Sequence, residues 1–164
     1  MFRCAYCLKR EQWGQVTREF DIDHFVAQAA RPGLVASYDN LIYSCARCNS
    51  IKLDKSVPGP VSSLTVDQVR LLPHGRLQGI TPLATSSILR LALNSPRLVE
   101  WRSTWIRIIQ LAEERDPHLH RQLMKFPDDL PDLAKLRPPS NARPDGREES
   151  FFEKRKRGQL PTIY

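Results

Sequence analysis

The sequence predicts a small α+β protein in which two strands and a helix are enclosed by two cysteine pairs and followed by a mainly α-helical C-terminal region. Three observations predict it: the cysteine pairs Cys4/Cys7 and Cys45/Cys48, the alternating pattern of residues 20–26 between them, and an apolar helical stripe beginning at Leu98. The length of 164 residues suits one domain.

Both cysteine pairs have the C-x2-C spacing of a zinc knuckle. Two such pairs supply the four thiolates of the tetrahedral site that structural zinc prefers. A redox pair and an iron–sulfur cluster would use the same residue type and stay open as alternatives. A zinc ion held by four sulfurs has no open coordination position, so we expect Zn²⁺ to stabilise the fold and not to catalyse. The predicted ligands are Cys4, Cys7, Cys45 and Cys48.

The segment between the knuckles predicts two strands and a short helix. Residues 20–26 alternate apolar and polar side chains, which is typical of a strand, and residues 30–33 form a turn. Residues 39–44 are a second extended segment that leads into Cys45. A helix is expected from Ala46 and ends before the proline-rich stretch at 57–60.

Beyond the knuckles, the sequence predicts a connector, one hairpin and three helices. The connector spans residues 57–84 and contains a hairpin of 70–72 with 76–78. A helix capped by residues 85–87 is expected to run through Leu93. A second helix begins at Pro96, and a third runs from Asp116-Pro117 to Met124.

The second of these helices carries one apolar stripe that we expect to pack against the rest of the domain. Its members are Leu98, Trp101, Trp105, Ile108 and Ala112, with Arg97, Arg102 and Arg107 off the stripe. The predicted organisation is therefore a core at residues 1–56, a connector at 57–84, a helical extension at 85–136 and a basic flexible tail at 137–164.

The charge balance favours a polyanionic partner. The chain has 25 Lys and Arg against 18 Asp and Glu, a formal charge of +7, and basic side chains neutralise phosphates. The tail adds four consecutive basic residues that are either solvated or in contact with phosphates: Lys154, Arg155, Lys156 and Arg157. No apolar run reaches the length of a membrane span, and the N-terminus lacks the pattern of a signal peptide, so we expect no membrane partner and a cytoplasmic location.

Four polar residues between the knuckles stand out: the adjacent pair Asp23-His24, Asn40 and Asn49. Together with the cysteine pairs and Lys52, this arrangement resembles the HNH endonucleases over residues 2–56, in a variant of the form Asp-His…Asn…Asn. The resemblance implies a zinc-stabilised ββα-metal core of treble-clef-like form. One position departs from the pattern, because Ala27 stands where many members have proline.

These residue types suit phosphodiester hydrolysis. An imidazole exchanges protons near neutral pH, so His24 is the predicted general base. The side-chain oxygens of Asp23 and Asn49 are hard ligands that suit a catalytic Mg²⁺ or Mn²⁺. Adjacent strand residues point to opposite faces, so this site requires a bend at the end of the first strand. The resemblance implies that Asn40 holds the loop and orients His24.

Lys52 lies about one helical turn beyond Asn49 and is predicted to contact a phosphate, with Arg47 as a second candidate. The function that follows is a metal-dependent HNH endonuclease that nicks DNA and leaves 5′-phosphate and 3′-hydroxyl ends. RNA as the substrate stays open. The alternatives are an inactive zinc-dependent nucleic-acid-binding module and a nuclease subunit of a multi-protein defence system. The C-terminal helices could then contact a second copy of the chain or a partner protein.

Overall fold

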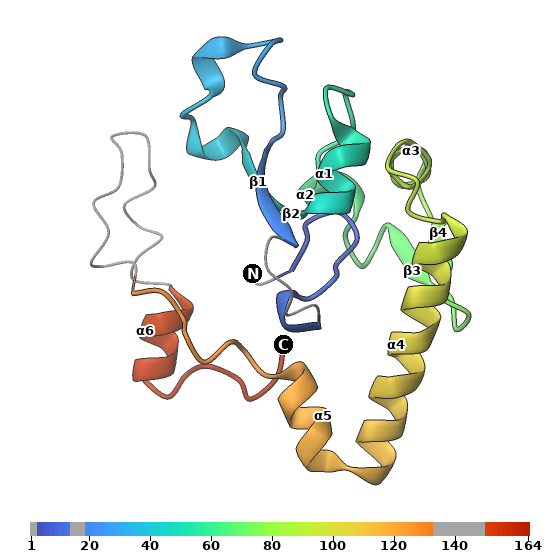
Figure 1. The fold of residues 1–164 in the computed structure, drawn as a ribbon, viewed down its shortest axis with the longest axis vertical. Coiled ribbons are helices and arrows are strands. Elements are labelled where there is room, and N and C mark those ends of the chain that lie inside the picture. Colours follow the sequence, from blue (N-terminus) through green and yellow to red (C-terminus); the bar gives the residue numbers. More distant parts are fainter. Residues whose placement is uncertain (1–2, 14–18, 133–149) are drawn as a thin grey trace.

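The computed structural model describes residues 3–13, 19–132 and 150–164 of the chain. Its first part is a ββα unit. Strands β1 (Phe20–His24) and β2 (Leu41–Cys45) pair antiparallel, with Phe20 opposite Cys45 and His24 opposite Leu41, and α1 (Ala46–Lys52) follows β2 directly. Figure 1 shows α1 lying beside this hairpin. The two strands and the helix predicted between the knuckles are therefore present, although β1 ends at His24 and not at Val26.

Short 3-10 turns occupy the remaining parts of this unit. They are η1 (Glu11–Trp13) before β1, and η2 (Pro32–Leu34) and η3 (Tyr38–Asn40) in the loop between the strands. On the hairpin, the aromatic rings of Phe20 and Tyr43 stack with their centroids 5.1 Å apart. This stacking explains why the alternating apolar positions favour the strand pairing.

A second antiparallel hairpin follows α2 (Pro60–Ser63) and consists of β3 (Val69–Leu71) and β4 (Leu77–Gly79). It lies where the sequence predicted a hairpin around residues 73–75. Its turn needs glycine at position 75, where φ is +85° and an added Cβ would collide with the carbonyl oxygen of Val99.

The helical region has three helices: α3 (Pro82–Arg90), α4 (Pro96–Arg115) and α5 (Pro117–Met124). The predicted start of α5 is confirmed, because the Asp116 side chain accepts a hydrogen bond from the Leu119 amide at 3.0 Å. The predicted cap of α3 is wrong. Thr81 accepts from the Ala84 amide at 3.2 Å, since Pro82 occupies the first turn and the helix starts earlier than expected.

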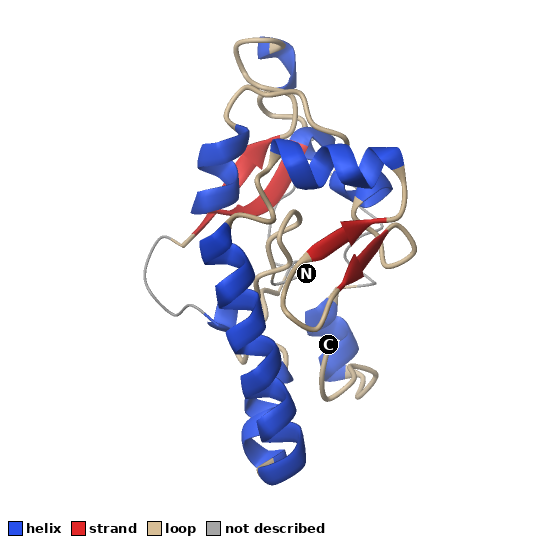
Figure 2. Cartoon of the chain, turned by 90° about the vertical axis from the view of Figure 1, so that its right-hand side faces the viewer, coloured by secondary structure: helices blue, strands red, loops and turns tan. Residues whose placement is uncertain are grey.

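Helix α4 is a long rod, and α5 folds back at its far end (Figures 1 and 2). The predicted stripe buries Leu98 and Ala112 and half-buries its two tryptophans. Ile108 is exposed, and Arg102, expected off the stripe, is buried and donates to two backbone carbonyl groups. Among the described residues, no helix is both long enough and apolar enough to cross a membrane.

The knuckles and the helical region share one core. The four cysteines and Tyr6 belong to the same buried cluster as Val57, which follows α1, and four residues of α3, α4 and the connection between them: Ile88, Leu91, Leu93 and Leu98. The cysteine-bearing turns are therefore covered by the C-terminal part of the chain.

The C-terminal residues differ from the expected flexible tail. Residues 137–149 lie outside the described part, but residues 150–164 contain α6 (Phe151–Lys156). The Tyr164 ring packs 4.4 Å from that of Phe126, and the Tyr164 amide donates to the Met124 carbonyl at 3.1 Å. Aromatic side chains in an otherwise basic segment explain this docking, because burying their rings is favourable.

Candidate functional site

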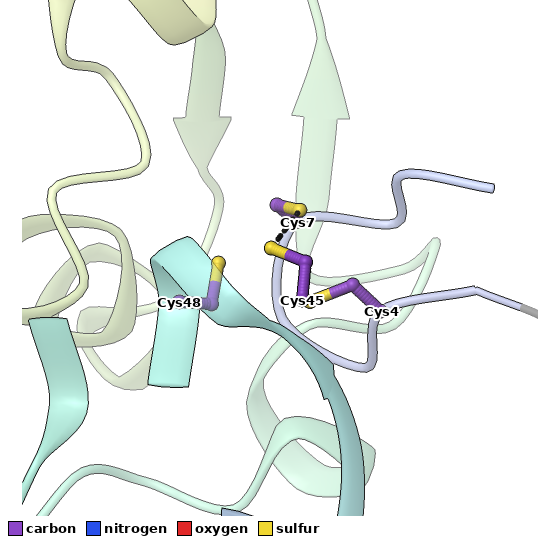
Figure 3. A group of neighbouring side chains, drawn as sticks. All are labelled: Cys4, Cys7, Cys45 and Cys48. Atoms are coloured by element: carbon purple, nitrogen blue, oxygen red, sulfur yellow. Dashed lines mark hydrogen bonds between the residues drawn. The ribbon is translucent and has the colours of Figure 1, made fainter. Parts of the chain in front are cut away.

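The four cysteines converge on one point, as Figure 3 shows. Their sulfur atoms all lie within 4.8 Å of one another, none is in a disulfide, and the Sγ atoms of Cys7 and Cys45 are 3.7 Å apart. A tetrahedral zinc with Zn–S bonds of about 2.3 Å holds its sulfurs about 3.8 Å apart. The donor set and its spacing therefore fit a structural zinc ion.

The local backbone explains how the knuckles meet. In the first knuckle the chain turns back at Leu8, whose φ is +61°, and the Ala5 amide donates to the Tyr43 carbonyl of β2 at 3.0 Å. The second knuckle is the junction of β2 with α1. Hydrogen bonds from the neighbouring thiols, that of Cys4 first, lower the pKa of Cys45, which favours the thiolate that binds metal.

Asp23 is buried, with an exposed fraction of 4%. Its Oδ2 accepts from the Tyr6 hydroxyl at 2.7 Å, and its Oδ1 accepts from the Lys52 ammonium at 3.1 Å. Burial raises the pKa of Tyr6, as does the hydrogen bond to Asp23, so the phenol remains a donor. Tyr6 was not among the residues selected from the sequence, because nothing in its local pattern indicates a distant carboxylate partner.

Lys52 is fully buried, at 0% exposure, and does not reach the surface as the sequence analysis expected. Besides Asp23, its ammonium contacts the carbonyl oxygens of His24 at 2.7 Å and Leu53 at 3.4 Å. In this arrangement it cannot contact a phosphate. The physical reason is that a buried carboxylate requires a compensating cation, and Lys52 is the residue of α1 that faces Asp23.

His24 is half-buried at the end of β1. Its Nε2 lies 3.0 Å from the carbonyl oxygen of Val35, and the Gln28 amide nitrogen lies 3.2 Å from Nδ1 and 3.3 Å from Nε2. A carbonyl oxygen only accepts hydrogen bonds, so Nε2 carries the hydrogen and Nδ1 of the neutral ring is an acceptor. Gln28 was not selected from the sequence.

Asn40 is buried at the end of the loop between the strands. Its Oδ1 accepts from the Val26 amide at 2.7 Å, and its Nδ2 donates to the carbonyl oxygens of Val26 at 3.1 Å and Leu34 at 3.2 Å. The Asn40 side chain thus links Val26, two residues after His24, to Leu34, the neighbour of Val35.

Asn49 contacts a different carboxylate from the one expected. Its Nδ2 donates to Asp21 Oδ2 at 3.4 Å, whereas Asp23 contacts Tyr6 and Lys52. Asp21 and Asp23 share one face of β1, and Asn49 and Lys52 lie one helical turn apart on α1, so each helix residue meets the strand residue nearest to it. The period-two spacing from Asp23 is the sequence pattern that could have identified Asp21.

In the comparison with protein families, residues 4–55 match the model of the HNH endonuclease family. Residues 4–55 form an HNH endonuclease domain. The match coincides with the stretch whose residues suggested the resemblance. No curated protein and no solved structure matched the chain in the other two comparisons.

The oxygen donors of the HNH domain have the chemistry that a hard divalent ion needs. A carboxylate offers about four lone-pair sites, and among the residues that the structure describes those of Asp23 accept from Tyr6 and Lys52 alone. The side-chain amide of Asn49 contacts Asp21 through its nitrogen. The Oδ1 atom of the same side chain accepts no hydrogen bond within the described residues. Carboxylate and amide oxygens fit Mg²⁺ or Mn²⁺, which keep several water ligands.

Arg47 of the HNH domain is tied to the helical region and is not directed to solvent as a phosphate contact would be. Its Nη2 donates to the Ala92 carbonyl and to the Ser95 hydroxyl, both at 2.9 Å. These bonds lie at the connection between α3 and α4. Arg47 therefore joins the HNH domain to its helical extension.

The basic run predicted to contact nucleic acid divides in two. Arg155 donates to the carbonyl oxygens of Pro127 and Asp128 at 2.6 and 2.9 Å, which holds α6 in place. Lys156 and Arg157 are exposed at the end of α6, and Lys154 is half-buried. Two of the four predicted basic residues are therefore open to a polyanion in this structure.

Proposed function

We propose that the HNH domain is a metal-dependent endonuclease that hydrolyses phosphodiester bonds in DNA, with His24 as the general base. The observation that carries the proposal is the 3.0 Å contact between His24 Nε2 and the carbonyl oxygen of Val35. The Val35 carbonyl fixes the hydrogen on Nε2, so Nδ1 presents a lone pair at the end of β1. The nuclease class itself follows from the family of the domain.

His24 would remove a proton from a water molecule that attacks the phosphorus. A base must be oriented, and the contacts of Asn40 supply the orientation, because they hold both chain segments that flank the imidazole. The Gln28 amide lies at hydrogen-bond distance from Nδ1 and would have to yield this position to the water. Expulsion of the 3′-oxygen leaves 5′-phosphate and 3′-hydroxyl ends.

Asp23 and Asn49 would hold the catalytic Mg²⁺ or Mn²⁺, with Asp21 as a third oxygen donor beside Asn49. When bound, such an ion supplies charge neutralisation at the leaving oxygen. Lys52 would hold the Asp23 carboxylate in place, as hydrogen-bonded neighbours of ligating carboxylates commonly do.

DNA is the proposed substrate because the chain carries a formal charge of +7 and has an exposed basic pair, Lys156 and Arg157, at the end of α6. Such side chains bind phosphates irrespective of base sequence. One active site cuts one strand at a time, so nicking is the expected primary event.

The test is conversion of supercoiled plasmid to nicked circles in the presence of Mg²⁺ or Mn²⁺. Replacing His24 by alanine should reduce the rate about 10²- to 10⁴-fold, the usual contribution of a general base, with unchanged zinc content. His74→Ala is the matched control, because His74 is exposed in the turn of the second hairpin.

Equal rates for His24→Ala and wild type would refute the assigned base. A wild-type protein that binds the plasmid without cutting it at any divalent ion concentration would instead support the inactive zinc-dependent binding module.

A further inference from the structure

Both oxygens of the buried Asp23 carboxylate are held by residues linked to the zinc knuckles, one within the first knuckle and one on the helix that follows the second. Tyr6 stands between the predicted zinc ligands Cys4 and Cys7 of the first knuckle. Lys52 lies one helical turn beyond Cys48, at the end of α1. Two segments far apart in the sequence thus meet at one carboxylate.

The hydrogen bonds from Tyr6 and Lys52 to Asp23 are buried, so they hold the carboxylate firmly in place. Tyr6 is 1% exposed and Lys52 is 0% exposed, so both donors are shielded from bulk water. Hydrogen bonds to charged groups in such surroundings are stronger than those at the surface.

Lys52 contacts both Asp23 and the backbone of His24, the proposed general base. The same ammonium that pairs with Asp23 at 3.1 Å donates to the backbone carbonyl of His24 at 2.7 Å. A shift of either knuckle would therefore change the position of the carboxylate and of the peptide group that carries the imidazole.

We propose that Tyr6 and Lys52 are positioning residues through which the zinc centre sets the geometry of the catalytic site. The zinc ion would then be required for catalysis as the anchor of Asp23 and His24, in addition to its contribution to folding. This inference rests on the proposed nuclease function. A displacement of about 1 Å at a reacting group can cost about 10²-fold in rate, so small movements of the knuckles suffice.

Tyr6→Phe is the most selective test, because it removes one hydroxyl group and keeps the ring in the core. Loss of an outer-shell partner typically costs about 10- to 100-fold in metal affinity or activity. We expect kcat for plasmid nicking to fall by that factor, or the Mn²⁺ concentration for half-maximal rate to rise by it. The KM for plasmid should stay constant, because the buried Tyr6 does not reach DNA.

Tyr43→Phe is the matched control. Tyr43 lies on β2 of the same hairpin, is half-buried and stacks on Phe20, away from Asp23. Its replacement should leave kcat, the Mn²⁺ dependence and the zinc content unchanged. If Tyr6→Phe matches Tyr43→Phe in all three, the inference is overturned.

A second measurement does not depend on activity. The chain has 4 histidines, so the ring signal of His24 in a proton–carbon correlation spectrum can be assigned with the His24→Ala variant. In the zinc-loaded full chain, Tyr6→Phe should shift the His24 signal and leave that of His74 in place, while Tyr43→Phe should move neither.

The two measurements separate failure of this inference from failure of the proposed function. If wild type does not cleave DNA, the proposed function fails and the spectrum alone decides the connection. A shifted His24 signal then supports the link between the knuckle and the end of β1. An unmoved His24 signal in zinc-loaded Tyr6→Phe overturns it.

Discussion

The ion pair between Lys52 and Asp23 makes a strong prediction about stability. The side chains of Lys52 and Asp23 are 0% and 5% exposed, and their charged atoms are 3.1 Å apart. Lys52→Met keeps an unbranched side chain of similar length but leaves the carboxylate buried without its cation. The predicted consequence is a large loss in the free energy of unfolding.

The size of the loss follows from the enclosure of the pair. Removing one partner of a buried ion pair typically costs about 3–5 kcal/mol, because the remaining charge stays desolvated. Replacing a lysine that is exposed to solvent would lower the free energy of unfolding by at most about 0.5 kcal/mol. The variant Asp23→Asn/Lys52→Met removes both charges, so it should be more stable than Lys52→Met alone.

The assay is urea unfolding followed by circular dichroism, with all variants at the same free zinc concentration because bound metal contributes to stability. Lys55→Met is the matched control, since Lys55 is exposed three residues further along. Within the described part of the chain, its ammonium donates only to the Ile51 carbonyl. Its free energy of unfolding should stay within about 0.5 kcal/mol of wild type.

The result that would refute this reasoning is a Lys52→Met protein as stable as Lys55→Met. If the same variant also had a weaker salt dependence of DNA binding, Lys52 would be a phosphate contact, as the sequence alone suggested, and not a buried structural cation.

Three further predictions concern the zinc centre and the basic residues. Removing zinc, or replacing Cys45 by serine, should unfold the HNH domain, because structural zinc contributes about 10–16 kcal/mol to the free energy of folding. An unchanged circular-dichroism spectrum would contradict this prediction. Arg47→Ala should lower stability by about 1–3 kcal/mol through its two lost hydrogen bonds, without altering the salt dependence of DNA binding measured by fluorescence anisotropy. The pair Lys156→Ala/Arg157→Ala should reduce the slope of log affinity against log salt by about 2, at about 0.9 per phosphate contact, with an unchanged melting temperature; an unchanged slope would exclude α6 from the DNA contact.

Local patterns predicted much of the fold because their causes are local. The alternation around Ile22 selects a strand, Pro96 suits the first turn of a helix, and Asp116 caps the next one. The cap of α3 was misplaced because Thr81 and residues 85–87 both offer side chains that can cap a helix. Pro82, in the first turn after Thr81, is the local feature that marks the earlier start.

Distant contacts were beyond the reach of such patterns. The docking of Tyr164 against Phe126, the tie from Arg47 to Ser95 and the hydroxyl of Tyr6 on Asp23 each join segments with no shared periodicity. Lys52 shows the same limit, because a lysine near a helix end has the same local sequence pattern whether it is buried or exposed.

The cysteine spacing and the order of the polar residues were sufficient to predict the four-cysteine cluster and the resemblance of residues 4–55 to the HNH family, because both depend on residue type and separation along the chain. Only the tertiary structure determines which carboxylate of β1 pairs with which donor of α1. The packing of α1 against β1 places Lys52 on Asp23 and Asn49 on Asp21. The buried Asp23 carboxylate is paired with the cation within reach, whereas the neutral Asn49 amide meets the exposed Asp21.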